Sequence, residues 1–242
     1  MSIKIHQTIA DWFGYRLVRK EKMVEVSQQP KEHLKLLLEN LHINHVLDIG
    51  ANTGQYAGML REIGYEGKIS SFEPVQSCFG ELVKKSQEDS KWNVYHYALG
   101  KEDSRANINV SIATAFSSFL TPNDYANNRY KRIQASHTEH VEVKRLDSVF
   151  DNITTPREKV YLKLDTQGFD LQAFAGAKGC MERILGMQSE VSATAIYEGM
   201  PDYLNSLQVY QNSGFRLTGL YPIAWDEPSM RVIEFDCYMR RM

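Results

Sequence analysis

The stretch HVLDIGANTG, residues 45–54, decides the fold of this chain. A short apolar run carries one acid, Asp48, and leads directly into two glycines, Gly50 and Gly54. This pattern is typical of a buried parallel strand that runs into a tight turn and then a helix. Because glycine has no Cβ and adopts positive φ, a ligand can approach the bare backbone of such a turn. The acid at the end of the strand favours a ligand that carries an amine or another cation.

The glycine spacing argues against two common phosphate-binding turns. A dinucleotide-binding turn needs G-x-G-x-x-G, but Asn52 occupies the middle glycine position and Gln55 follows three residues later. Asn52 therefore argues against an NAD-dependent oxidoreductase. A P-loop is excluded as well, because no G-K-[ST] follows the turn.

A second predicted strand, residues 68–73, ends in Glu73, which lies 25 residues after Asp48. An acid at this place accepts hydrogen bonds from both hydroxyls of a ribose. NAD sites use the same contact, so Glu73 indicates a nucleoside without choosing between cofactors. The alternative interpretation is a solvated acid ahead of a proline turn.

Five motifs follow one another along roughly residues 45–220: VLDIGANTGQYAGML, SFEP, NVYHYALG, RLDSV and YLKLDTQGFDLQAFAGA. Together they resemble the FkbM family of S-adenosylmethionine-dependent methyltransferases. The resemblance implies a Rossmann-like class I methyltransferase fold, with S-adenosyl-L-methionine as the cofactor. The residues that we expect to contact this cofactor are Asp48, Gly50, Asn52, Gly54, Glu73 and Ala98.

One turn departs from the family pattern. Where the family commonly has D-V-E-G, this chain has Asp165-Thr166-Gln167-Gly168. Gln167 keeps the hydrogen-bonding capacity of the family's glutamate but loses its charge.

Length and composition fit one α/β domain with ample core: 242 residues, of which 43% are hydrophobic and 24% charged. A formal net charge of −2 gives no overall attraction to nucleic acid, so no nucleic-acid partner is expected. The three cysteines are far apart and form no C-x-x-C pair. We therefore expect reduced thiols and a cytoplasmic protein, with neither a signal peptide nor a transmembrane segment.

Hydrophobic periodicity predicts alternating strands and helices, hence a mostly parallel seven-stranded sheet with a C-terminal antiparallel hairpin. The expected strands cover 45–50, 68–73, 93–98, 159–165 and 187–192, and the hairpin covers 215–221 and 231–239. The expected helices cover 30–40, 54–64, 75–86, 169–184 and 202–213. Ligands of such sheets bind outside the carboxyl ends of the strands.

Two segments stand apart from this alternation. Residues 1–40 form an N-terminal helical segment ahead of a methyltransferase domain over 41–242. Within residues 1–22 a basic amphipathic helix is expected, which either makes a peripheral membrane contact or packs on the domain or a second subunit, as in a homo-oligomer. Residues 100–158 are expected to be an inserted lid that holds a hydroxyl-rich substrate, with Arg129, Lys131 and Arg132 placed to meet a phosphate or carboxylate on it; a solvated surface loop is the alternative.

Methyl transfer to an alcohol benefits from a general base at the cofactor. Asp165, at the end of an apolar strand, is the first candidate, although it could instead cap helix 169–184 or hold the turn. Glu190 on the next strand is the second candidate, and His140 near the lid is the third. No metal is predicted, because the two acids lack further ligands at a suitable spacing.

These observations predict a methyltransferase that acts on a hydroxyl of a sugar, a glycan or a related small molecule. Two alternatives stay open. One is an N-methyltransferase of the same fold, and the other is a non-catalytic subunit that keeps the cofactor-binding fold.

Overall fold

The computed structural model describes residues 29–242. The amphipathic helix predicted for residues 1–22 lies outside the described residues. Within 29–242, every helix is too short or too polar to span a membrane.

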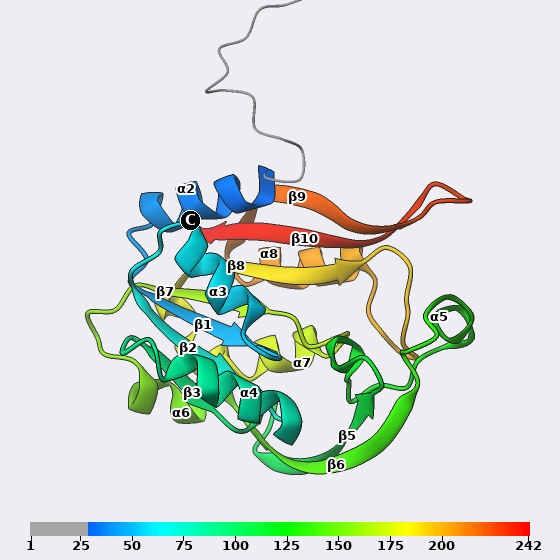
Figure 1. The fold of residues 1–242 in the computed structure, drawn as a ribbon. Coiled ribbons are helices and arrows are strands. Elements are labelled where there is room, and N and C mark those ends of the chain that lie inside the picture. The colour runs from blue at the N-terminus through cyan, green and yellow to red at the C-terminus, as the bar shows by residue number, and fades with distance from the viewer. Residues whose placement is uncertain (1–28) are drawn as a thin grey trace, which may run out of the picture.

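A seven-stranded sheet forms the centre of the molecule, in the order β3-β2-β1-β7-β8-β10-β9 (Figure 1). β1, β2, β3, β7 and β8 run parallel, while β10 is antiparallel to both of its neighbours, β8 and β9. The prediction of a mostly parallel sheet that ends in an antiparallel hairpin is confirmed. The strands are β1 His45–Ile49, β2 Lys68–Phe72, β3 Trp92–Tyr95, β7 Val160–Leu164, β8 Ile184–Ser192, β9 Phe215–Asp226 and β10 Arg231–Arg241.

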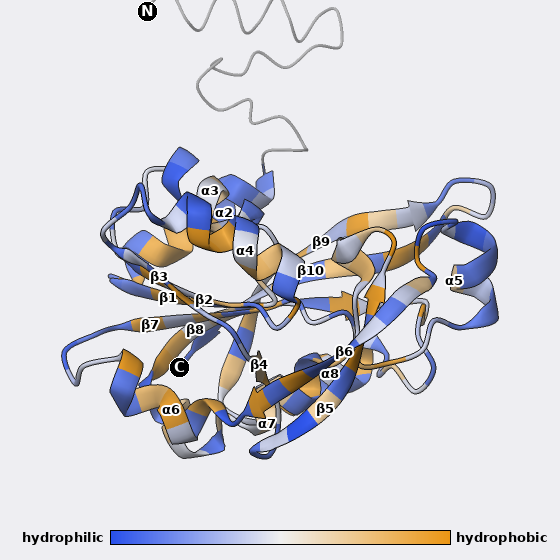
Figure 2. Cartoon of the chain, turned by 60° about the horizontal axis from the view of Figure 1, so that its bottom comes forward, coloured by the Kyte–Doolittle hydropathy of each residue, from blue (hydrophilic) through white to orange (hydrophobic). Residues whose placement is uncertain are grey.

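Helices cover both faces of this sheet, as a parallel sheet requires. Figure 2 shows α2, α3 and α4 on one face and α6, α7 and α8 on the other. The central strands β1 and β7 are buried at every position, which explains their nearly continuous apolar sequences. The helices are α2 Gln29–Asn40, α3 Gln55–Glu62, α4 Gln76–Ser86, α6 Leu146–Ile153, α7 Asp170–Ala175 and α8 Tyr203–Asn212.

Two helical predictions need correction. The single helix expected over 169–184 is α7 followed by the 3₁₀ helix η4, Lys178–Arg183. The break lies at Gly176, where a Cβ would come within 2.0 Å of the Gly100 carbonyl oxygen. Helix α2 was assigned to a separate N-terminal segment, but its Leu34 packs in the same core cluster as Val46 of β1. It is therefore part of the helical layer.

The expected lid region is mostly regular structure. Strands β4 Ala98–Leu99, β5 Ser104–Ser111 and β6 Ala135–Lys144 form a second, three-stranded sheet in the order β4-β6-β5. Helices η3 Thr114–Phe116 and α5 Asp124–Arg129 connect β5 to β6, and we call residues 104–144 the inserted unit. The last part of the predicted insertion, α6, belongs to the main helical layer.

The inserted unit is tied to the tip of the β9–β10 hairpin, which extends beyond the rest of the sheet toward α5 (Figure 1). Arg129 donates to the Asp226 carboxylate at 2.7 Å and to the Trp225 carbonyl at 2.8 Å. Arg129 is therefore engaged with the protein, and the expectation that it reaches a substrate anion is corrected.

All three cysteines are free and buried, in three different places. Cys78 of α4 packs against the inserted unit, in a cluster with Ile108 and Val110. Cys180 in η4 and Cys237 in β10 lie in the main core.

Candidate active site

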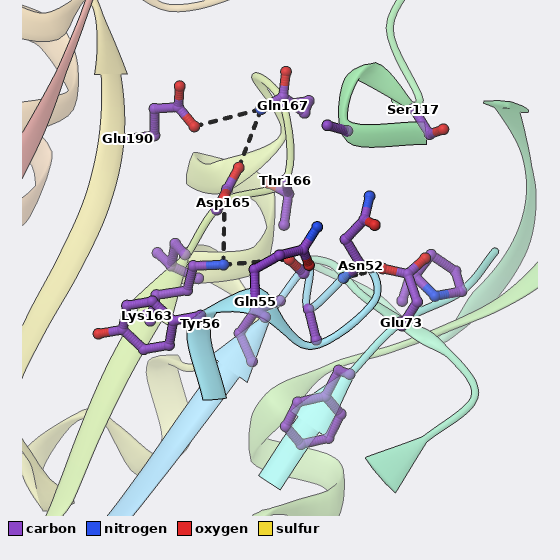
Figure 3. A pocket seen from close by; sticks show the side chains of 18 of the residues that line it. Asn52, Gln55, Tyr56, Glu73, Ser117, Lys163, Asp165, Thr166, Gln167 and Glu190 are labelled. Carbon is purple, nitrogen blue, oxygen red and sulfur yellow. Dashed lines mark hydrogen bonds and ion pairs between the residues drawn. The ribbon is translucent and has the colours of Figure 1, made fainter. Parts of the chain in front are cut away.

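A cavity of about 490 Å³ lies at the carboxyl ends of the parallel strands. It lies beside β1, where the strand order reverses: β2 and β3 continue the sheet on one side of β1, and β7 and β8 continue it on the other. Its walls come from the turn after β1, the end of β2, the turn after β7, strands β8 and β10, and the inserted unit. Figure 3 shows side chains from several of these elements pointing into one space. Pockets of this size and place commonly bind small molecules.

The turn after β1 gives the cavity a floor of bare backbone. Gly50 has a φ of 76°, and a Cβ on it would lie 1.9 Å from the Asp165 carbonyl oxygen, so no side chain fits there. Asn52 also lies in the left-handed region, at a φ of 48°. Gly50 and Asn52 line the cavity as expected.

Gly54 does not line the cavity. Its φ of 85° starts helix α3, and a Cβ there would lie 2.7 Å from the Trp92 ring and 3.0 Å from Leu82. The expectation that Gly54 contacts the cofactor is therefore corrected, because this glycine allows the helix to pack closely against those two side chains.

Glu73 lies on the cavity wall with only 5% of its surface exposed. The Asn52 N–H donates to its Oε2 and the Val75 N–H to its Oε1, both at 2.8 Å. Burial raises the pKa of Glu73 to about 7. The two hydrogen bonds act in the opposite direction, but their effect on the pKa is smaller. Since a carboxylate oxygen accepts more than one hydrogen bond, each oxygen keeps capacity for a ligand hydroxyl.

Asp48 has no exposed surface and does not line the cavity. Ser71 donates to its Oδ2 at 3.0 Å, and the ammonium of Lys163, its register partner on β7, lies 3.1 Å from its Oδ1. The expectation that Asp48 meets a cationic ligand is wrong, because its partner cation comes from the protein.

Lys163 also reaches the cavity. Its ammonium lies 3.3 Å from Oδ2 of Asp165 and 3.2 Å from the Gly50 carbonyl oxygen. Burial alone would lower the pKa of Lys163, but the charges of Asp165 and Asp48 outweigh it and raise that pKa. Lys163 is therefore a fixed positive charge under the turn after β7.

Asp165 and Glu190, both predicted as catalytic, are brought together on one wall of the cavity (Figure 3). Burial would raise the pKa of Asp165, but the Lys163 charge and a hydrogen bond with Glu190 hold it below its usual range. Burial and the charge of Asp165 raise the pKa of Glu190 well above its usual range. The surroundings therefore favour the ionised form of Asp165 and the protonated form of Glu190.

The alternative that Asp165 holds the turn is not what the geometry shows. Asp170 takes that place, since its Oδ1 accepts the Thr166 N–H at 3.2 Å, and no side chain caps α7. Burial and the charge of Asp165 raise the pKa of Asp170 to about 7.

His140 is not part of the site. It lies on the exposed strand β6, where its Nδ1 is 3.0 Å from Oδ1 of Asn107, and it does not line the cavity. The expectation that His140 acts as a base is corrected. Ala98 lines the cavity with Leu99, and its contact with the cofactor stays a prediction.

Sequence analysis missed several cavity residues. Tyr56 of α3 donates to Gln188 of β8 at 2.9 Å, and Lys163 lies over the Tyr56 ring, 5.2 Å from its centre. Asp236 of β10 is the register partner of Glu190, and burial raises its pKa to about 6. Lys163 could have been found from the sequence, because a lysine within the apolar run Val160–Leu164 needs a buried partner. Among residues 29–242, no set of three acidic, histidine or cysteine side chains is placed to hold a metal ion.

Residues 48–217 match the family model of the methyltransferase FkbM domain. The chain belongs to this family. The matched part of the FkbM domain contains the turn after β1, Glu73, and the Asp165 and Glu190 pair, and it ends before Asp236. No protein with a curated description matches the sequence.

The FkbM domain is also similar in fold to solved methyltransferase structures. Fibrillarin of Aeropyrum pernix, solved with bound S-adenosyl-L-methionine, is 12% identical, with a TM-score of 0.46 over 81% of this chain and 66% of its own. Magnesium protoporphyrin IX methyltransferase of Synechocystis is 11% identical, with a TM-score of 0.48 over 100% and 92% of the two chains. An rRNA methylase of Streptococcus thermophilus is 8% identical, with a TM-score of 0.49 over 91% and 98%.

Proposed function

We propose that this FkbM methyltransferase binds S-adenosyl-L-methionine in the cavity and methylates a hydroxyl of a sugar, a glycan or a related small molecule. One observation carries the proposal: a single cavity joins Glu73, a buried acceptor suited to ribose hydroxyls, to Asp165, an ionised carboxylate suited to act as a base. The turn between them offers backbone where no side chain fits.

The residues present fit the cofactor. Glu73 would accept hydrogen bonds from the two ribose hydroxyls, one on each oxygen, and Ala98 would lie against the adenine. Gly50 and Asn52 would hold the amino-acid part against their backbone. Bound S-adenosyl-L-methionine supplies a methyl group on a positively charged sulfur, and the carboxylates around this cavity favour a cation there.

Asp165 is the base in this proposal. Lys163 keeps its carboxylate ionised, so it would accept the proton of the acceptor hydroxyl as the oxygen gains the methyl group. Glu190, whose raised pKa favours its protonated form, would donate a hydrogen bond to the acceptor or to Asp165. In-line alignment of the hydroxyl supplies the rest of the rate enhancement.

The charges favour a neutral, hydroxyl-rich acceptor over nucleic acid. Three carboxylic acids besides Glu73 line the cavity, Asp165, Glu190 and Asp236, and Lys163 is the one cation among the described lining residues. Such a wall lacks the cluster of cations that a nucleic-acid backbone needs and offers hydrogen-bond acceptors to hydroxyl groups. We also propose a reducing, cytoplasmic location, because all three cysteines are free. The membrane contact through residues 1–22 and a homo-oligomer stay predictions.

The same charges favour one second candidate, an N-methyltransferase. A cationic amine acceptor would be held by the carboxylates of Asp165 and Asp236, and Asp165 would take up its proton before the nitrogen accepts the methyl group. A screen with amines beside alcohols separates the two functions.

The test combines binding and transfer. Calorimetry with S-adenosylmethionine, S-adenosylhomocysteine and NADH should show binding of the first two only. Transfer of a labelled methyl group is then screened over sugar nucleotides, oligosaccharides, lipid-linked glycans and matched amines. Binding of NADH alone would refute the proposal, and transfer to amines only would favour the second candidate.

The variant Glu73→Gln tests the ribose contact. An amide nitrogen cannot accept from a backbone N–H or a hydroxyl, so S-adenosylmethionine should bind less tightly by about 1–3 kcal/mol. Glu88→Gln, at an exposed acid of the same charge, is the matched control and should bind normally. Unchanged affinity in Glu73→Gln removes Glu73 from the site.

A further inference from the structure

The turn after β7 holds a glutamine in a backbone conformation that few side chains adopt. Gln167 has a φ of 53°, followed by Gly168 at 89°. A left-handed residue other than glycine costs about 1–2 kcal/mol, so its surroundings must hold it. Ser118 of the inserted unit does so, because its buried hydroxyl donates to the Gln167 carbonyl at 2.7 Å.

The side chain of Gln167 uses its whole amide. Its Nε2 donates to Oδ1 of Asp165 at 3.1 Å and to Oε2 of Glu190 at 3.4 Å, as Figure 3 shows. Its Oε1 accepts from the Tyr197 hydroxyl at 3.1 Å. An amide has two N–H donors and one acceptor oxygen, and here both donors go to carboxyl groups.

Tyr197 contacts the other end of the amide. The tyrosine is 1% exposed, and its hydroxyl is also 2.8 Å from the carbonyl oxygen of Phe116, a residue of the inserted unit. The Tyr197 hydroxyl has a single hydrogen for these two oxygens, so it does not orient the amide by itself; the Asp165 carboxylate, which only accepts, turns Nε2 of Gln167 toward the acids and leaves Oε1 facing Tyr197. The inserted unit therefore holds Gln167 at its backbone through Ser118 and at its side chain through Tyr197.

We propose that Gln167 is a positioning residue, which holds the carboxyl groups of Asp165 and Glu190 side by side as a pair that shares one proton. The proposal rests on the proposed function in one respect, the role of Asp165 as the base. A neutral donor that reaches both groups stabilises the ionised one without adding charge. Of the two carboxyl groups, Lys163 contacts only that of Asp165, so it cannot link the pair.

The electrostatic surroundings explain why the linking group is neutral. A carboxylate at position 167 would add a third acid beside Asp165 and Glu190 and could not donate to either of them when ionised. The titratable and charged groups that act on the pair lie on several neighbouring elements: Lys163 on β7, Asp170 on α7, Tyr197 after β8, and Glu234 and Asp236 on β10.

The variant Gln167→Met tests the proposal, since it keeps the length of the side chain and removes all three hydrogen bonds. Asp165 loses a donor to its ionised form, so its pKa rises and the acid limb of the kcat–pH profile should shift upward by about one pH unit. Because the two carboxyl groups are also no longer held in place, kcat at pH 7 should fall about tenfold through lost positioning of the base, and the Kd for S-adenosylmethionine should stay within about twofold. Gln167→Glu should shift the acid limb further in the same direction.

Tyr197→Phe is a second variant that leaves the amide in place but removes the hydroxyl that contacts its Oε1. It should shift the acid limb upward by less than Gln167→Met does, and it decides the question if Gln167→Met fails to fold. Gln211→Met, on the exposed face of α8, is the matched control and should keep the wild-type profile.

A readout without catalysis comes from unfolding by urea between pH 5 and 8. Carboxyl groups whose folded pKa is raised lose stability as the pH rises through that pKa, so Gln167→Met should lose more stability over this range than the wild type. An unshifted acid limb together with an unchanged pH dependence of unfolding overturns the proposal. A wild-type protein without methyl transfer would instead refute the proposed function, and the unfolding experiment would still decide the role of Gln167.

Discussion

Replacing Lys163 with methionine tests the ion pair beneath the cavity, because methionine keeps most of the length and removes the charge. The side chain of Lys163 is 6% exposed, and its ammonium serves Asp48, Asp165 and the Gly50 carbonyl at 3.1, 3.3 and 3.2 Å. Without it, the buried Asp48 carboxylate keeps one donor, the hydroxyl of Ser71.

The expected cost follows from the burial of the two acids. Removing one partner of a buried ion pair costs about 3–5 kcal/mol, because the other charge stays buried and unpaired. Asp48 is fully buried, so most of this cost arises there, whereas the Asp165 side chain is 36% exposed and water compensates part of its loss. We therefore expect Lys163→Met to lower the free energy of unfolding by about 3–5 kcal/mol.

The assay is urea denaturation followed by far-ultraviolet circular dichroism at pH 8, on Lys163→Met, Asp48→Asn and the double variant. The double variant leaves no charge unpaired in the interior and should be more stable than Lys163→Met. Lys178→Met, at an exposed lysine of η4, is the control and should unfold like the wild type. A loss below about 1 kcal/mol in Lys163→Met, or a double variant no more stable than it, would refute the reasoning.

Three further predictions concern single positions. Gly50→Ala would place a Cβ 1.9 Å from the Asp165 carbonyl oxygen, so calorimetry should show an affinity for S-adenosylmethionine that is reduced more than tenfold. Gly58→Ala is the control: its Cβ meets no atom within 4 Å, and this variant should bind normally. Asp170 has a pKa raised from 3.8 to about 7, which corresponds to about 4 kcal/mol of stability lost as the pH rises through that window. Asp170→Asn should therefore flatten the decline in unfolding free energy between pH 4 and 8, and an unchanged slope would contradict this. Because the pKa of Glu73 is about 7, cofactor affinity should be lower at pH 6 than at pH 8 by calorimetry, and equal affinities would separate binding from Glu73 ionisation.

The strand ends were predictable from sequence because glycine and acidic residues follow apolar runs there. The runs that become β1, β2 and β7 are nearly continuous, which is the pattern of strands buried on both faces. Their ends placed Gly50, Glu73 and Asp165 at one edge of a parallel sheet, and the structure brings all three to one cavity.

The mistaken residues share a cause, since each depends on a partner distant in the chain. Asp48 looked available for a ligand because nothing near it reveals that Lys163 lies beside it on β7. His140 was placed near the site because residues 100–158 read as a lid, but pairing with β5 puts it on an exposed strand. Asp236 was missed because its position follows from the register of β10 with β8.

The buried cysteines give this protein three reporters of local opening. Cys78 becomes reactive only when α4 separates from the inserted unit, Cys180 when the short helix after α7 detaches, and Cys237 when the central sheet opens. The rate at which a water-soluble thiol reagent modifies each one in native buffer ranks the resistance of these three regions to opening, without any introduced label. Unequal rates of alkylation would show which of the three regions opens most readily.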